Sequence, residues 1–99
     1  MKDRDKVEKL LSLCLDLNPE GTLKDAGSKK PTVFFDFSGH TGSVDIWVHP
    51  HGWNPEGADY WYRNTSWGKW ILCFKSGEDK QVSIDDVIAH LERLKEENV

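Results

Sequence analysis

Apolar and polar residues alternate along two segments near the middle of the chain, residues 32–37 and 44–48. This alternation is typical of strands that turn one face toward a core. The apolar residues predicted to face the core are Val33, Phe35, Phe37, Val44, Ile46 and Val48. Between the two segments, residues 38–43 contain Gly39 and Gly42, which permit the backbone geometry of a hairpin. We therefore expect a hairpin at the centre of an antiparallel sheet.

Two more strands are expected further along the chain. Residues 60–63 form a short aromatic segment, and in residues 69–75 the side chains of Trp70, Leu72 and Phe74 share one parity. Residues 49–57 hold two prolines and two glycines in nine positions, so a loop is expected there. Residues 64–68 are expected to form a turn, and residues 76–80 to close the last strand. The middle of the chain is thus predicted to be a meander of three or four strands.

A helix is expected before the strands, over residues 4–17, because apolar residues recur there at spacings of three and four. Its predicted apolar stripe is Val7, Leu10, Leu11, Cys14 and Leu17 or Leu15. Leu13 lies off this stripe, which suggests contact with the helix on more than one side. Asp3 or Asp5 is expected to cap the helix. Pro19 is expected to end it at residue 18, and residues 21–31 to form a polar loop.

A second helix is expected after residue 83. Ser83 and Asp86 have the spacing of a capping box, although Asp stands where Glu or Gln is usual. The predicted apolar stripe is Ile84, Val87, Ile88, Leu91 and Leu94. The order helix, three or four antiparallel strands, helix indicates one α+β domain over residues 1–99, with the sheet packed against two amphipathic helices.

The second face of the sheet carries the candidate binding residues. They are predicted to be Phe34, Trp47, His49 and Trp61, with Arg63 beside them and Trp53 in the following loop. If both helices pack on the other face, this much exposed aromatic area would mark a partner or ligand surface. If the first helix instead covers this face, the same aromatics form part of the core.

The partner class follows from charge and aromatic content. The formal net charge of −4 lies mostly on residues 83–99, which hold two basic and five acidic side chains. The sheet is close to neutral, which argues against binding duplex nucleic acid. We therefore expect a non-enzymatic module that binds another protein or a second copy of itself as a homodimer. The alternative is a single-stranded nucleic acid, sugar or other small ligand that stacks on the same aromatics.

Cysteine and histidine usage bounds the remaining chemistry. Cys14 and Cys73 are too few and too far apart for a disulfide framework, which favours a cytoplasmic protein with reduced thiols. No apolar run has the length of a membrane span. His49 and His51 form a His-x-His pair of the kind that can hold zinc, but the further candidates His40, His90, Cys14 and Cys73 lack ligand-like spacing. No catalytic motif is found either, so no metal, cofactor or enzymatic activity is expected.

Residues 34–40, Phe-Phe-Asp-Phe-Ser-Gly-His, are followed by a loop containing Gly52 and Trp53. In this texture and in its size, the chain resembles the small accessory proteins of phages and prophages. The resemblance is one of type, without a defining motif. It implies an inhibitor or modulator of a host nucleoprotein or defence complex, and it assigns a role to no individual residue.

Overall fold

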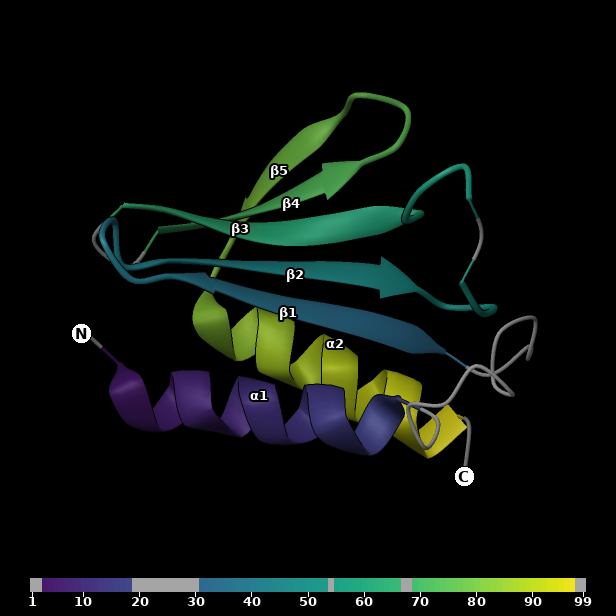
Figure 1. Ribbon diagram of the computed structural model, residues 1–99, viewed down its shortest axis with the longest axis horizontal. Helices are drawn as coiled ribbons and strands as arrows, with labels where there is room; N and C mark the ends of the chain where they lie inside the picture. The colour runs from purple at the N-terminus through teal and green to yellow at the C-terminus, as the bar shows by residue number, and fades with distance from the viewer. Residues whose placement is uncertain (1–2, 19–30, 54, 67–68, 98–99) are drawn as a thin grey trace.

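The protein folds as two layers, a five-stranded sheet and a pair of helices that lie on one of its faces (Figure 1). The structure is a computed structural model, and it describes residues 3–18, 31–53, 55–66 and 69–97. The elements follow one another as α1 (Arg4–Leu17), β1 (Thr32–Ser38), β2 (Ser43–His49), β3 (Tyr60–Ser66), β4 (Lys69–Phe74), β5 (Asp79–Val82) and α2 (Ile84–Glu97). The predicted α+β class and element order are confirmed.

The strands form a simple meander in the order β1-β2-β3-β4-β5, and all neighbours are antiparallel. The predicted hairpin has the register Val33 opposite Val48 and Phe37 opposite Val44. The sheet has five strands instead of the expected three or four. Residues 79–82, Asp-Lys-Gln-Val, are too polar to show a strand pattern, and they become a strand by pairing with β4. Most of the predicted loop at residues 21–31 lies outside the described residues.

Residues 64–66 of the expected turn belong to β3 instead, and residues 67 and 68 lie outside the described residues. Backbone pairing with β4 carries β3 as far as Ser66, with a register shift between Asn64 and Ser66. Polar residues such as Asn64 are disfavoured in strands, but ladder hydrogen bonds to a neighbouring strand override that preference.

The core lies between the sheet and the helices. The sheet contributes Val33, Val44, Ile46, Val48, Tyr62 and Trp70. The helices contribute Leu10, Leu13, Cys14 and Leu17 from α1 and Ile84, Val87, Leu91 and Leu94 from α2. The predicted parity of the strands is thus confirmed for the buried positions. Phe37 has the predicted parity, but it is 52% exposed because it lies near the hairpin end of β1, beyond the packed part of the core.

The apolar stripe of α1 differs from the predicted one. Leu13 is buried, while Leu11 and Leu15 are exposed. The buried residues of α1 are Leu10, Leu13, Cys14 and Leu17, which recur at spacings of three and four. Leu13 therefore belongs to the apolar stripe. Successive residues are about 100° apart around a helix axis. With Leu13 buried instead of Leu11, the buried face of α1 is therefore rotated relative to the predicted face.

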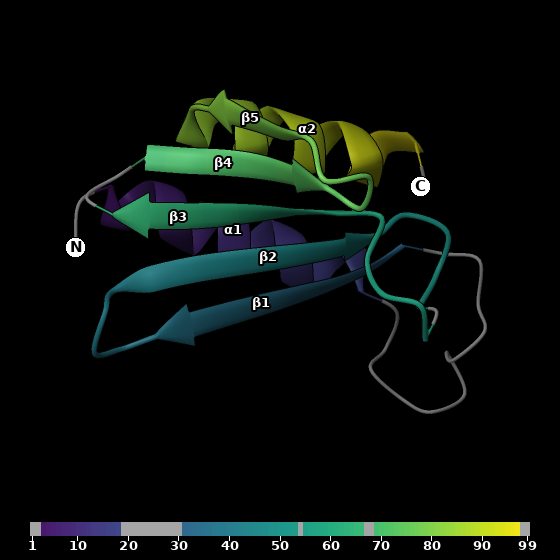
Figure 2. The ribbon, with the colours of Figure 1, turned by 90° about the horizontal axis from the view of Figure 1, so that it is seen from above.

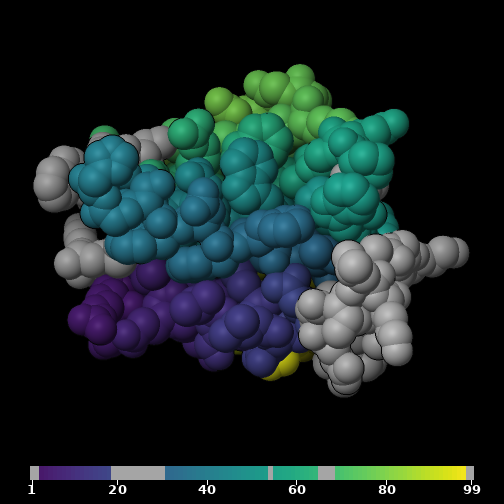
Figure 3. All heavy atoms as spheres, viewed as in Figure 1, coloured from purple at the N-terminus to yellow at the C-terminus, as the bar shows by residue number. Residues whose placement is uncertain are grey.

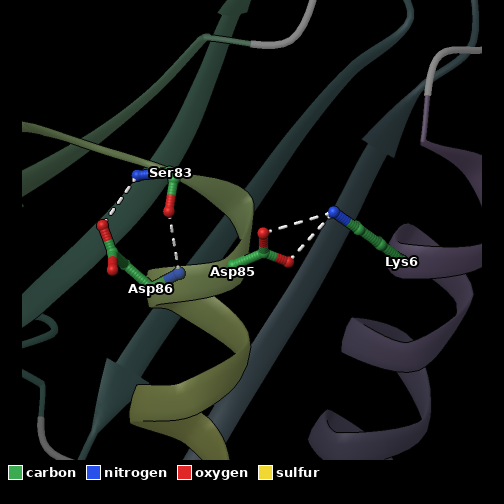
Figure 4. Close-up of polar contacts among 4 residues, drawn as sticks. All are labelled: Lys6, Ser83, Asp85 and Asp86. Carbon is green, nitrogen blue, oxygen red and sulfur yellow. Dashed lines mark hydrogen bonds and ion pairs between the residues drawn. The ribbon is translucent and has the colours of Figure 1, made fainter.

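The two helices lie side by side and are joined by ion pairs near both ends. Lys6 Nζ lies 3.0 Å from Asp85 Oδ1, and Lys95 Nζ lies 2.8 Å from Asp16 Oδ2. Figure 4 shows the first of these pairs beside the start of α2. The carboxylates and amines are exposed to water, which screens their attraction, so each pair adds little stability and mainly orients the helices.

The start of α2 has the predicted capping box (Figure 4). The backbone N–H of Asp86 donates to Ser83 Oγ at 3.0 Å, and the backbone N–H of Ser83 donates to Asp86 Oδ2 at 3.0 Å. These hydrogen bonds lower the pKa of the Asp86 carboxyl. At α1, Asp3 occupies the expected cap position with a positive φ of 58°, but its side chain makes no capping hydrogen bond.

No helix in the described part of the chain has both the length and the apolar character needed to cross a membrane.

Candidate functional site

The sheet face opposite the helices is not covered by any described helix or strand (Figure 2). Both helices lie behind the sheet in this view, which removes the expectation that α1 might cover the aromatic face. Side chains alternate along each strand, so the residues opposite in parity to the core point outward here. We call this surface the open face; it carries Phe34, Asp36, Asp45, Trp47, His49, Trp61 and Arg63.

An aromatic row crosses the open face from strand to strand. Phe34 of β1 stands opposite Trp47 of β2, which stands opposite Trp61 of β3. The rings of Trp47 and Trp61 are stacked, with centroids 5.2 Å apart and planes 28° from parallel. Phe34 remains 46% exposed and Trp47 37% exposed. The strand register therefore aligns three of the predicted site residues across three neighbouring strands.

His49 lies on the same parity but is buried, with only 5% of its surface exposed. Its ring meets Phe34 edge to face, with centroids 5.6 Å apart. Among the described residues no group bonds to its Nδ1 atom, although that atom is fully buried. Burial lowers the pKa of His49, and the nearby Asp59 carboxylate opposes this effect. His49 is thus a neutral support beneath Phe34, rather than the exposed contact residue that the sequence predicts.

A charged flank runs beside the aromatic row. Asp36 stands opposite Asp45, and Asp45 stands opposite Arg63. Arg63 Nε lies 3.4 Å from Asp45 Oδ1, so this cation is already engaged with one of the two carboxylates. Asp36 is exposed, and within the described ranges no hydrogen bond or ion pair reaches its carboxylate. Arg63 balances the charge of Asp45, which leaves the negative charge of Asp36 unbalanced. Asp36 and Asp45 also repel each other, because like charges stand directly opposite on paired strands.

The loop after β2 places Trp53 at the His49 end of the sheet, 50% exposed. Two backbone hydrogen bonds fix the loop, from Gly52 N to His49 O and from Asp59 N to Val48 O. Gly52 has a φ of 98°, a conformation that residues with a Cβ rarely adopt. Figure 1 shows residues 55–59, which lead into β3, rising on the side of the sheet away from the helices. No described ring contact joins Trp53 to the aromatic row.

A second cluster, formed by a histidine and two tyrosines on the helix side of the sheet, was not predicted from the sequence. His90 of α2 lies between two tyrosines of β3, with Tyr60 Oη 3.3 Å from Nε2 and Tyr62 Oη hydrogen-bonded to Nδ1. The Tyr60 and His90 rings are also stacked, with centroids 5.2 Å apart. Both imidazole nitrogens are therefore occupied. The signal was the parity shared by Tyr60 and Tyr62, but nothing in the sequence places His90 between them.

Burial sets the protonation of this Tyr–His cluster. It lowers the pKa of His90, with a further lowering from Arg93 and an opposing effect of Glu97. It raises the pKa of Tyr60 to about 12 and raises that of Tyr62 as well. At neutral pH the cluster thus holds a neutral imidazole and two protonated phenols, which satisfies hydrogen bonds within the two-layer contact.

The two thiols are also held in their protonated form. Burial raises the pKa of Cys14 to about 12. Cys73 is buried on the open-face side of β4, where burial and a hydrogen bond with Asp79 raise its pKa. In the described ranges no three His, Cys, Asp or Glu side chains come close enough to hold a metal ion.

Comparisons with protein-family models, with curated proteins and with solved structures give no match. The geometry of the open face is therefore the basis for assigning a function. Its aromatic row offers a flat apolar surface, and its flank offers a carboxylate without a counter-charge. Such a surface suits noncovalent binding of an apolar group that lies beside a cation.

Proposed function

We propose that this protein is a non-enzymatic binding module that recognises another protein through its open face. One observation carries the proposal: the strand register places Phe34, Trp47 and Trp61 opposite one another on three neighbouring strands, on the sheet face that the helices leave bare. The Trp53 loop would border the same contact.

The energetics of aromatic burial support a protein partner. Tryptophan is enriched among the few interface residues that dominate binding energy, because it buries a large area with little loss of conformational freedom. Trp47 and Trp61 already restrict each other by stacking, so less entropy is lost when a partner covers them. Large exposed apolar patches on a folded chain commonly mark such interfaces.

The state of the potentially reactive groups supports a non-enzymatic role. A thiol attacks as a thiolate, and the raised pKa values of Cys14 and Cys73 keep both thiols protonated at neutral pH. The His90 nitrogens are both engaged by tyrosines and so do not offer a free base.

The alternative ligands fit the charged flank less well. A single-stranded nucleic acid needs cations along its backbone path. Arg63 is paired with Asp45, and Asp36 adds a further negative charge beside the aromatic row. We therefore place a protein partner ahead of a nucleic acid or a sugar. Within that class, the resemblance to phage accessory proteins leads us to propose a component of a host complex, with a second copy of the chain as the other option.

The test compares what three forms of the protein capture from a lysate of its native cell. W47S removes the centre of the aromatic row, and L15S changes an exposed leucine on the helix side as the matched control. We expect a specific partner to be captured by the wild type and by L15S, and to be lost with W47S. Equal capture by all three forms would contradict the proposal.

Two solution measurements separate the remaining occupants. The masses of the purified wild type and of W47S in solution, measured by light scattering, show whether the wild type is a homodimer and whether W47S dissociates it. Titration with short single-stranded oligonucleotides and oligosaccharides, followed by tryptophan fluorescence, tests the stacking alternative. A saturable fluorescence change that disappears in W47S would favour that ligand over a protein as the partner of the open face.

A further inference from the structure

The two edges of the sheet differ in how well they are protected against pairing with another strand. β1 and β5 are the outer strands, so each has one side without a strand neighbour. Unpaired backbone N–H and C=O groups at such an edge form a template for an incoming strand. Folded proteins usually block their edges with short strands, charged residues or proline.

The β5 edge has these protections. β5 is only four residues long, Asp79–Val82, and two of those residues, Asp79 and Lys80, are charged. The β1 edge lacks most of them. β1 spans seven residues, Thr-Val-Phe-Phe-Asp-Phe-Ser, without proline or lysine and with one charge, at Asp36. Its pairing with β2 is regular over its full length, so no bulge turns the edge aside.

Hydrogen bonds show which backbone groups of β1 face outward. The N–H of Val33 donates to Asn18 Oδ1 at 2.6 Å, so it points away from β2. In an antiparallel strand alternate residues direct their backbone groups to the same side. Phe35 and Phe37 therefore also point their N–H and C=O groups outward. Within the part of the chain that the structure describes, no hydrogen-bond partner is found for these groups.

Exposed aromatic side chains flank these free backbone groups on both faces of β1. Phe34 on the open face is 46% exposed, and Phe37 on the helix face is 52% exposed. In Figure 3 the atoms of β1 and β2 form the surface above α1, and no other described element covers them. In Figure 2 β1 forms one margin of the sheet. An added strand would thus gain both ladder hydrogen bonds and apolar contacts.

We propose that the β1 edge binds an extended segment of a partner protein as a sixth strand, with apolar residues beside Phe34 and Phe37 and a lysine or arginine beside Asp36. The basic residue is required by charge, because Asp36 already faces Asp45 and lacks a cation. Opposite charges on directly paired strands stabilise the pair, and like charges destabilise it.

A second copy of β1 meets this requirement less well. An antiparallel pair centred on Asp36 places the two Asp36 carboxylates opposite each other. A pair centred on Phe35 places Asp36 opposite Phe34, which supplies no charge. Arg63, the cation nearest in register to Asp36 and Asp45, is engaged with Asp45. A distinct partner with a basic residue is therefore favoured over self-pairing.

This inference rests on the proposed function only in taking the partner to be a protein. It adds how that partner is held: a strand at the β1 edge extends the sheet, and its side chains on the open face continue the row that begins at Phe34.

The first experiment selects binders from a displayed library of short random peptides, using the immobilised wild-type chain. We expect the enriched peptides to alternate apolar residues and to share a lysine or arginine at one position. Replacing that residue by glutamate should weaken binding to the wild type by about tenfold. D36K should reverse the preference, since the exposed site tolerates either charge.

The second experiment separates the backbone of β1 from its side chains. F37P removes an outward N–H together with the phenyl ring, whereas F37A removes the ring alone. The selected peptide should bind F37P about tenfold more weakly than F37A. Thermal melting of both variants checks that they fold. In hydrogen exchange, the amides of Phe35 and Phe37 should become protected when the peptide binds to the wild type.

Several outcomes would overturn the proposal: no enriched peptide, enriched peptides without a basic residue, an unchanged charge preference in D36K, or equal binding to F37P and F37A. Peptides that depend on Trp47 but not on the Phe37 N–H would reject the edge while supporting the open-face function. A concentration-dependent dimer that F37P abolishes would assign the edge to a second copy instead. Peptides that bind normally to W47S and protect Phe35 would support the edge and leave the open face without a role.

Discussion

Among single residues, His90 links the fold to pH. Its imidazole is packed between two tyrosines, and burial lowers its pKa below the ordinary value of 6.5. Its neighbours from β3 are Tyr60 and Tyr62, and the charges near it on α2 are Arg93 and Glu97. The folded chain thus binds the His90 proton more weakly than the unfolded chain does.

Stability should therefore fall as the solution becomes acidic. Well above pH 6.5 the histidine is neutral in both states and its contribution is complete. Below that value the unfolded chain takes up the proton first, so the free energy of unfolding decreases by up to about 1.4 kcal/mol per pH unit for this group. Urea titrations between pH 8 and pH 5 measure the slope, and NMR titration of the ring protons measures the pKa.

His90→Gln provides the control, because glutamine keeps hydrogen-bonding groups at this position but does not titrate. Its pH slope should be shallower than that of the wild type. Some slope remains, since burial also lowers the pKa of His49. Identical slopes for the wild type and His90→Gln would show that the cluster does not control the acid response.

Among the elements, α2 has the better-defined start. Ser83 and Asp86 satisfy each other's backbone N–H groups, and the acidic first turn favours the helix dipole. Ser83→Ala should lower the free energy of unfolding by roughly 0.5–2 kcal/mol. Ser76→Ala, in the turn after β4, is the matched control and should change it by less than about 0.5 kcal/mol. Chemical denaturation of both variants tests the difference, and equal values would argue against the cap.

The elements also show what a sequence pattern reveals. The alternation in β1 and β2 predicts both their pairing and their buried parity, because a strand has only two faces. The same alternation places Phe34, Trp47 and Trp61 on one face. The capping box at Ser83 is also readable, since it depends on residues three positions apart.

The parts that escaped prediction depend on neighbours distant in the sequence. β5 is a strand because β4 offers a free edge, and its own residues show no apolar pattern. Leu13 rather than Leu11 is buried because the core formed with the sheet and α2 lies on that side of α1. His49 is covered by Phe34 and by its own loop, and His90 meets two tyrosines that are 28 and 30 residues away. No local pattern contains these contacts.

For the whole molecule, the two-layer arrangement means that one sheet face supports stability and the other is free for binding. Trp70 on the inner face is almost completely buried, whereas Trp47 on the open face is 37% exposed. Trp70→Ala should therefore cost about 3–5 kcal/mol of unfolding free energy through the cavity it leaves. Trp47→Ala should cost markedly less, and Trp53→Ala, in the exposed loop, should remain within about 0.5 kcal/mol.

Urea denaturation of the three alanine variants provides the comparison. Because each variant replaces a tryptophan by alanine, differences in their unfolding free energies depend only on where each tryptophan lies. A loss in Trp47→Ala as large as that in Trp70→Ala would mean that the open face stabilises the fold itself. The aromatic row would then be structural, and W47S would be unsuitable for testing recognition.

The pairing of α1 with α2 has a consequence for the order of events during synthesis. Lys6 meets Asp85 and Lys95 meets Asp16, so each of these contacts joins residues 79 positions apart. The ribosome makes α1 first, and its buried leucines lack their helical neighbour until residues 84–97 have emerged. The meander can pair strand by strand during elongation, whereas closure of the helix layer has to follow translation of α2. Until then the nascent chain exposes an apolar helix stripe, a form that chaperones bind and that truncated products would retain.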